Sequence, residues 1–121
     1  MVSGVEAIVG ARDDALYGPL LLVGTGGIFV ELVGDASLAL LPVGPEEICK
    51  TIDHLKLARL LDGFRGKPAL DRKALEKAVG GLAQFFIDHR DRVVDIEINP
   101  LIVREDGKGA IAVDVRVIWQ T

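Results

Sequence analysis

The sequence predicts an α+β fold in which a largely antiparallel sheet is covered on one side by two helices. Segments with two-residue apolar alternation or short apolar runs stand at both ends of the chain, as expected for strands. Two segments between them carry apolar residues at helical spacing. The last two strands are separated by Asp106-Gly107, a pair that favours a tight hairpin turn. The order is therefore several strands, two helices and a closing hairpin.

Composition limits the domain count and the class of protein. The chain has 121 residues, which is one domain at most, over 1–121. Half of the residues are apolar and 26% are charged, which argues against a disordered chain. The formal net charge of -4 argues against general binding of nucleic acid, for which a basic stripe is expected.

Membrane and redox signals are also absent from the sequence. No apolar run reaches the length of a membrane-spanning helix, and the first residues lack the basic-then-apolar order of a signal peptide. A single cysteine, Cys49, excludes an internal disulfide, and we expect a buried structural thiol within a helix. We therefore expect a soluble cytoplasmic protein with no membrane partner.

The first half of the chain predicts strands joined by turns. Arg12 to Pro19 is a polar, turn-rich connection. The strands that we predict are Val5–Ala11, Leu20–Val23, Ile28–Val33 and Ser37–Leu41.

Gly24-Thr25-Gly26-Gly27 is a glycine cluster that does not fit the common nucleotide motifs. The dinucleotide fingerprint requires a third glycine where Phe29 stands, and the P-loop ends in Gly-Lys-Ser/Thr, which is missing. The following residues are β-branched and aromatic, which favours a strand. The cluster is therefore either a hairpin turn or a place where backbone N–H groups approach an anion.

Two helices follow. The first begins at Gly44, with Pro45 and two acidic residues in its first turn, and ends near Gly63. The second begins at Asp71 as N-cap and ends near His89. We expect His89 and the other histidine, His54, to be surface or structural groups, because neither has a nucleophile motif or zinc-ligand spacing nearby.

The closing hairpin, Val93 to Val117, carries the clearest chemical pattern. If Asp106-Gly107 is a two-residue turn, opposed residues have numbers that sum to 213. Asn99 then faces Asp114, and Glu97 faces Arg116, all on one face, with the apolar residues on the other. An amide and a carboxylate side by side suit Mg²⁺, although a hairpin with one solvated face gives the same spacing.

Glu97 and Arg116 are expected to pair across the strands. Pro100 indicates an edge, a strand end or a bulge.

The hairpin segments IEINPLIV and AIAVDVRV resemble the end of the ATP-grasp domain of NDP-forming acyl-CoA synthetases. This group includes ADP-forming acetate-CoA ligase and, more distantly, the β subunit of succinyl-CoA synthetase. GTGGIFVEL is similar to the GxGGIFVE signature of the same enzymes, and the GVE, RD and YGP segments are similar to their first strands, with Tyr17 in place of the usual Phe. The resemblance covers essentially the whole chain.

The resemblance implies a role for several residues. Asn99 and Asp114 would hold Mg²⁺. Glu6 and Arg12 would lie near the phosphates of ATP or ADP, or else serve only as a strand-edge carboxylate that pairs with a loop arginine. The glycine turn, with Gly24, Gly26 and Gly27, would contact phosphates or an incoming phosphorylated loop. Glu31 ends the signature, and its role is open.

The resemblance further implies that the chain is the C-terminal lobe of an ATP-grasp domain from an ADP-forming acyl-CoA synthetase. It would assist phosphoryl transfer between a phosphohistidine and ADP. Its partners would be the other ATP-grasp lobe and the CoA-binding domains, so the chain is expected to be inactive alone. One alternative is a regulatory or structural module of a protein of the protein acetyltransferase type. Another is a fold fragment that self-associates as a homo-oligomer.

Overall fold

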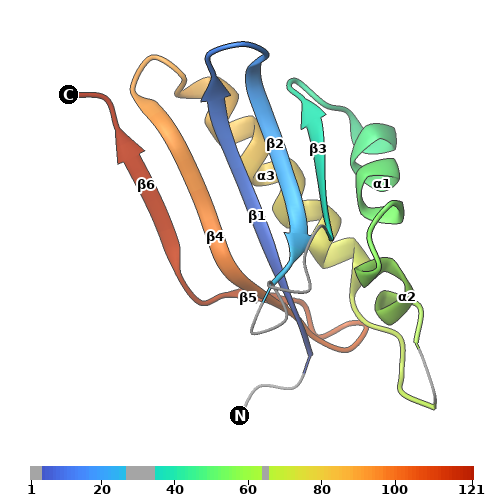
Figure 1. Cartoon of the computed structure of the whole chain (residues 1–121). Coiled ribbons are helices and arrows are strands. Elements are labelled where there is room, and N and C mark those ends of the chain that lie inside the picture. The colour runs from blue at the N-terminus through green and yellow to red at the C-terminus, as the bar shows by residue number, and fades with distance from the viewer. Residues whose placement is uncertain (1–3, 27–34, 64–65) are drawn as a thin grey trace.

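A computed structural model describes residues 4–26, 35–63 and 66–121. Figure 1 shows one sheet with helices behind it. The strands are β1 (Val5–Asp14), β2 (Gly18–Thr25), β3 (Ala36–Leu40), β4 (Val93–Val103), β5 (Ala110–Ala112) and β6 (Val115–Trp119). The helices are α1 (Pro45–Asp53), α2 (Leu57–Leu61) and α3 (Arg72–Asp88).

The sheet is antiparallel throughout its described pairings, as the alternation of the strands predicts. Its order is β3-β2-β1-β4-β5, and β6 also pairs with β4, beyond the end of β5. Strands from the two ends of the chain therefore meet at the centre, where β1 lies beside β4. This arrangement confirms the predicted fold class.

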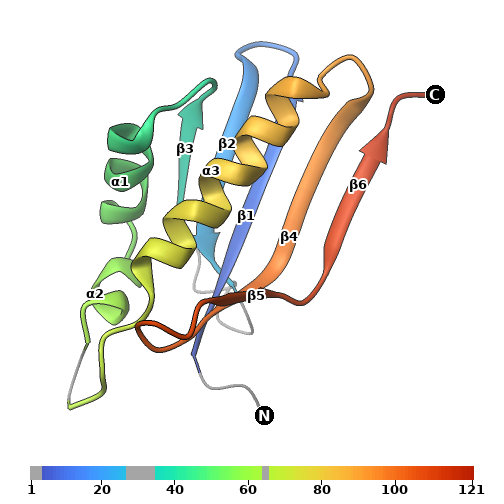
Figure 2. The ribbon, with the colours of Figure 1, turned by 180° about the vertical axis from the view of Figure 1, so that it is seen from behind.

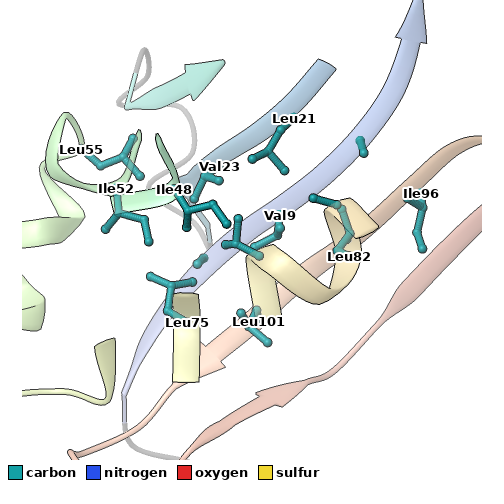
Figure 3. Close-up of a cluster of buried hydrophobic side chains, with 14 of the residues drawn as sticks. Val9, Leu21, Val23, Ile48, Ile52, Leu55, Leu75, Leu82, Ile96 and Leu101 are labelled. Carbon is teal, nitrogen blue, oxygen red and sulfur yellow. The ribbon is translucent and has the colours of Figure 1, made fainter. Parts of the chain in front are cut away.

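The helices lie on one face of the sheet. Figure 2 shows α3 running across this face, with α1 beside the β3 edge. The core lies between the sheet and the helices, and Figure 3 shows side chains from β1, β2 and β4 meeting those of α1 and α3. No helix or strand of the described ranges covers the opposite face, which we call the open face. None of the described helices is long and apolar enough to cross a membrane.

The first predicted helix is divided in two, whereas the second is confirmed. After α1 the chain tightens, because Leu55 N donates to the carbonyl of Ile52, three residues back, at 2.9 Å. The N–H of Lys56 then donates to the Asp35 carboxylate at 2.7 Å, outside the helix. In α3, Asp71 is the N-cap and His89 the C-cap, as expected.

The predicted polar connection from Arg12 to Pro19 is wrong in extent. Both flanking strands continue into it, because β1 and β2 stay paired as far as Asp14 and Gly18. The remaining turn is closed by Asp14, whose carboxylate accepts hydrogen bonds from the N–H groups of Leu16 and Tyr17 at 2.8 and 3.0 Å. These two bonds lower the pKa of Asp14. The predicted strand Ile28–Val33, with Gly27 and Glu31, lies outside the described residues.

The closing hairpin has the predicted turn and register. Lys108 N donates to the carbonyl of Glu105 at 2.8 Å, and Gly107 between them has a φ of +86°, which glycine adopts without strain. The pairs Glu97↔Arg116 and Leu101↔Ala112 have the predicted sum.

The predicted alternation, with Val94, Ile96, Ile98 and Ile102 on the buried face, fails in two places along β4. At the start of the strand Val93 is buried and Val94 is exposed, where the register shifts between Val93 and Asp95. Asn99 and Pro100 together oppose the single residue Ile8 of β1, which makes a bulge. Beyond this bulge Leu101 and Val103 are buried, where simple alternation predicts Ile102. The bulge falls at Pro100, one of the outcomes that the sequence allows.

Candidate functional site

Asn99 and Asp114 are neighbours on the open face. The N–H of Asn99 donates to the main-chain carbonyl of Asp114 at 3.0 Å, and the next bond runs from Val113 N to the carbonyl of Pro100 at 3.0 Å. Asp114 lies in the short interruption between β5 and β6, directly across from the bulge in β4. Both side chains are exposed to solvent. The main-chain bond thus brings Asn99 and Asp114 side by side between the two ladders, as predicted from the turn.

The chemistry of this pair fits a hard cation. Mg²⁺ binds oxygen ligands and often takes only one or two from the protein, while water and phosphate oxygens fill the other positions. Within residues 4–26, 35–63 and 66–121, no three carboxylate, histidine or cysteine side chains are grouped for metal binding. A cation here would therefore depend on this pair and on oxygens from a ligand.

Next to the pair, Arg116 holds two carboxylates of β4. Its Nη2 lies 3.4 Å from Glu97 Oε2 and 3.5 Å from Asp95 Oδ1. The predicted pairing of Glu97 with Arg116 is confirmed. Sequence reasoning missed Asp95, although it shares the parity of Glu97 and Asn99 along the strand. This shared parity is the signal that could have identified it.

Glu6, Gly24 and Gly26 lie at the same end of the sheet as Asn99. Gly24 pairs with Ile8, the residue opposite the bulge, so it is two strand spacings, about 10 Å, from Asn99. Gly26 N donates to the carbonyl of Glu6 at 2.8 Å. This N–H is already used within the protein, so Gly26 would need to break that bond to bind a phosphate.

Gly24 and Gly26 also have a steric reason to be glycine. A Cβ on Gly24 would lie 3.0 Å from the carbonyl oxygen of Asp35, and one on Gly26 would lie 3.3 Å from that of Ala7. Backbones therefore approach closely at this end of the sheet. Thr25 N donates to the Asp35 carbonyl at 3.0 Å, and the Thr25 hydroxyl donates to the Asp35 carboxylate.

Arg12 does not lie beside the Asn99–Asp114 pair. It pairs with Leu20 and Asp95, four residues along β1 from Ile8, which is about 13 Å. Because Glu6 is six residues, about 20 Å, from Arg12 on the same strand, these two side chains cannot pair with each other. Glu6 and Arg12 therefore occupy opposite ends of the open face.

A hollow of about 110 Å³ lies on the open face beside Arg12. Leu20, Leu22 and Leu38 line one side of it, and Asp95, Glu97 and Arg116 line the other. Gly10 lies between the two sides, because it pairs with Leu22 on one strand and Glu97 on the next. Sequence reasoning did not identify this hollow, since its lining depends on the order of the strands.

Two reactive side chains lie away from the open face. Cys49 is half-buried between α1 and α3, which corrects the expectation of a buried thiol. Its Sγ–H donates to Glu76 Oε2 at 3.1 Å, and this bond raises the pKa of the thiol. Nδ1 of His54 lies 2.6 Å from the carbonyl oxygen of Lys50, at the end of α1, in agreement with a structural role.

The fold, one antiparallel sheet with a helix-covered face and an open face, is that of an ATP-grasp lobe. The chain belongs to the family described as ATP-grasp domain, whose model matches residues 1–118.

Two relatives of the chain are ADP-forming CoA ligases. It is 34% identical over 114 residues to the ADP-forming 4-hydroxybutyrate-CoA ligase of Nitrosopumilus maritimus, covering 94% of this chain and 16% of the ligase. It is 31% identical over 115 residues to the β subunit of ADP-forming acetate-CoA ligase II of Pyrococcus furiosus, covering 95% of this chain and 49% of the subunit. The chain thus spans half or less of the length of these relatives.

A solved structure has the same fold. One match is to acetyl-coenzyme A synthetase 1 of Candidatus Korarchaeum cryptofilum, solved with coenzyme A and Mg-AMPPCP, with its phosphohistidine segment pointing towards the nucleotide-binding site. The TM-score is 0.89 at 31% identity, over 99% of this chain and 55% of that chain.

Proposed function

We propose that this chain is the C-terminal, Mg-nucleotide-binding lobe of an ADP-forming acyl-CoA synthetase. The observation that carries the proposal is the placement of Asn99 and Asp114 side by side on the open face, joined by a main-chain hydrogen bond. The two relatives described above are both ADP-forming CoA ligases, which supports the parent reaction. The Mg-AMPPCP bound to the Korarchaeum synthetase supports the choice of metal and nucleotide as ligands.

In this proposal each residue has a defined task. Asn99 and Asp114 would hold Mg²⁺ through their side-chain oxygens. Bound there, Mg²⁺ would neutralise charge on a transferring phosphoryl group. Glu6 and the glycines at 24, 26 and 27 would border the phosphate end of the nucleotide. Arg12, about 13 Å further along β1, would contact a different part of the ligand or its partner.

The lobe would need partners to complete the reaction. The open face would be covered by the second ATP-grasp lobe, and CoA-binding domains would supply the acyl group and a phosphohistidine. This chain would then assist transfer of the phosphoryl group between the phosphohistidine and ADP. Hydrophobic side chains on the open face favour such a cover, because Leu38 and Leu40 are 59% and 61% exposed.

Calorimetric titration of the chain with ADP and ATP, with and without Mg²⁺, tests the proposal. The comparison uses wild type, Asn99→Ala, Asp114→Ala and Asp91→Ala, the last being a matched control because Asp91 is exposed in the loop after α3. We expect Mg²⁺-dependent binding in wild type and Asp91→Ala. We expect a loss on the order of 10-fold or more in the other two variants.

Two outcomes contradict the proposed metal role of Asn99 and Asp114. Binding that does not depend on Mg²⁺, or that survives in Asn99→Ala and Asp114→Ala, would remove the metal role of the pair. If no nucleotide binds, the same titration on the chain joined to its second lobe separates a catalytic lobe from a regulatory or structural module, because only the catalytic lobe regains Mg²⁺-dependent binding.

A further inference from the structure

Asp71 joins the start of α3 to the tip of the closing hairpin. Its Oδ1 accepts from Ala74 N at 3.1 Å, which caps the helix. Its Oδ2 accepts from Gly109 N at 2.9 Å and from Gly107 N at 3.2 Å, both in the turn that follows β4. The residue is only 9% exposed. One carboxylate thus holds two segments that are more than thirty residues apart.

The main chain around Asp71 strengthens this connection. Asp71 N donates to the carbonyl of Arg104 at 2.7 Å, and Asp106 N donates to the carbonyl of Ala69 at 3.1 Å. Leu70 also forms a bridge with Glu105. The segment before α3 therefore lies along the hairpin tip like a short additional strand, and the Asp71 carboxylate ends it.

The position of the tip decides which face Asp114 occupies. Successive side chains of a strand point to opposite faces, so a slip of one residue would move Asp114 to the helix-covered face. Between the tip and Asp114, β5 pairs with β4 over three residues, and beyond the break β6 pairs with β4 in the same register. An anchor at the tip therefore holds the register from the β5 side, in addition to the turn and to the β6–β4 pairing.

We infer that Asp71 is a positioning residue: by fixing the hairpin tip against α3, it keeps Asp114 beside Asn99 on the open face. It acts through the backbone, since Gly109 is five residues, roughly 17 Å, from Asp114. The consequence for Mg²⁺ rests on the proposed function, whereas the consequence for hairpin register does not. The hydrogen bond from Gly109 is also the main cause that lowers the pKa of Asp71, in agreement with an ionised anchor.

The test compares Asp71→Ser and Asp71→Asn with wild type and Asp91→Ser. Serine still caps the helix but is too short to reach the turn, whereas asparagine keeps the size of the side chain and one acceptor oxygen. The readout is amide hydrogen exchange at Asn99 and Val113, whose N–H groups donate across the hairpin. We expect these two amides to exchange faster in Asp71→Ser, with β1–β2 amides unchanged and Asp71→Asn intermediate.

Mg²⁺-dependent ADP binding is measured on the same variants. We expect a loss on the order of 10-fold in Asp71→Ser and none in Asp91→Ser. Unchanged exchange at Asn99 and Val113 would overturn the inference. A uniform increase at all amides would also overturn it, because it would indicate that Asp71 stabilises the fold only as a helix cap. If wild type binds no Mg-ADP, the proposed function fails, and the exchange pattern still decides the role of Asp71.

Discussion

The N–H of Asn99 donates to the carbonyl of Asp114 at 3.0 Å, so the two residues lie side by side across the hairpin. We predict that Asn99→Asp destabilises the chain without metal, because two carboxylates would then be opposed, at roughly 0.2–1 kcal/mol. Mg²⁺ should reverse this loss if the proposed site is present, since it would bind both carboxylates. Thermal unfolding in EDTA and in Mg²⁺ measures the effect.

The double variant Asn99→Asp, Asp114→Asn is the control for this prediction. It exchanges the amide and the carboxylate, so it restores one charge to the pair while keeping both oxygens. Its unfolding temperature in EDTA should return close to that of wild type. A loss in Asn99→Asp that Mg²⁺ does not reverse would argue against a metal site.

The lowered pKa of Asp71 predicts a dependence of stability on pH. A carboxylate whose pKa is lower in the folded than in the unfolded state stabilises the fold above its unfolded value, about 4, and loses this effect as the pH falls through the folded value. Denaturant unfolding of wild type and Asp71→Asn should therefore differ at pH 7. The difference should narrow below about pH 4, and a constant difference at all pH values would contradict an ionised anchor.

Phe86 on α3 is fully buried against the sheet. We predict that Phe86→Ala lowers the free energy of unfolding by about 3–5 kcal/mol, because it removes a large side chain and leaves a cavity. Phe85→Ala is the matched control, since Phe85 is half-buried and stacks on His89 with ring centroids 4.2 Å apart. Urea unfolding should give a clearly smaller loss for Phe85→Ala, and equal losses would place the core elsewhere.

The hydrogen bond to Glu76 raises the pKa of the Cys49 thiol and so lowers its thiolate fraction. We predict that Glu76→Ala speeds alkylation of Cys49 by iodoacetamide near pH 8. Glu46→Ala is the control, because Glu46 is exposed in the first turn of α1. An unchanged rate in Glu76→Ala would mean that exposure, and not the pKa, limits the reaction.

The features that depend on local rules could be predicted from the sequence. Asp106-Gly107 determines the turn, and the turn determines that Asn99 faces Asp114. The N-cap preference of aspartate likewise places the start of α3 at Asp71. In both places the necessary interactions lie within a few residues or follow from the period of a strand.

The features that depend on distant segments could not be predicted in the same way. Arg12 belongs to β1 because its neighbours are paired on both sides, with β2 and with β4. The first helix is interrupted where Lys56 donates to Asp35, twenty-one residues away. The second role of Asp71 is similar, since its partners in the turn lie far along the chain. Propensity and periodicity contain no information on such partners.

Gly10 divides the open face into two unlike halves. Gly10 has no side chain, and a Cβ at this position would lie 3.3 Å from the carbonyl oxygen of Ile96. The middle of β1 therefore carries no side chain at this point of the open face. Leucines stand on the β2–β3 side and charged residues on the β4–β6 side. A partner that lies across β1 therefore contacts hydrophobic side chains on one side and charged side chains on the other. This division of the open face favours one orientation of such a partner over the reverse orientation.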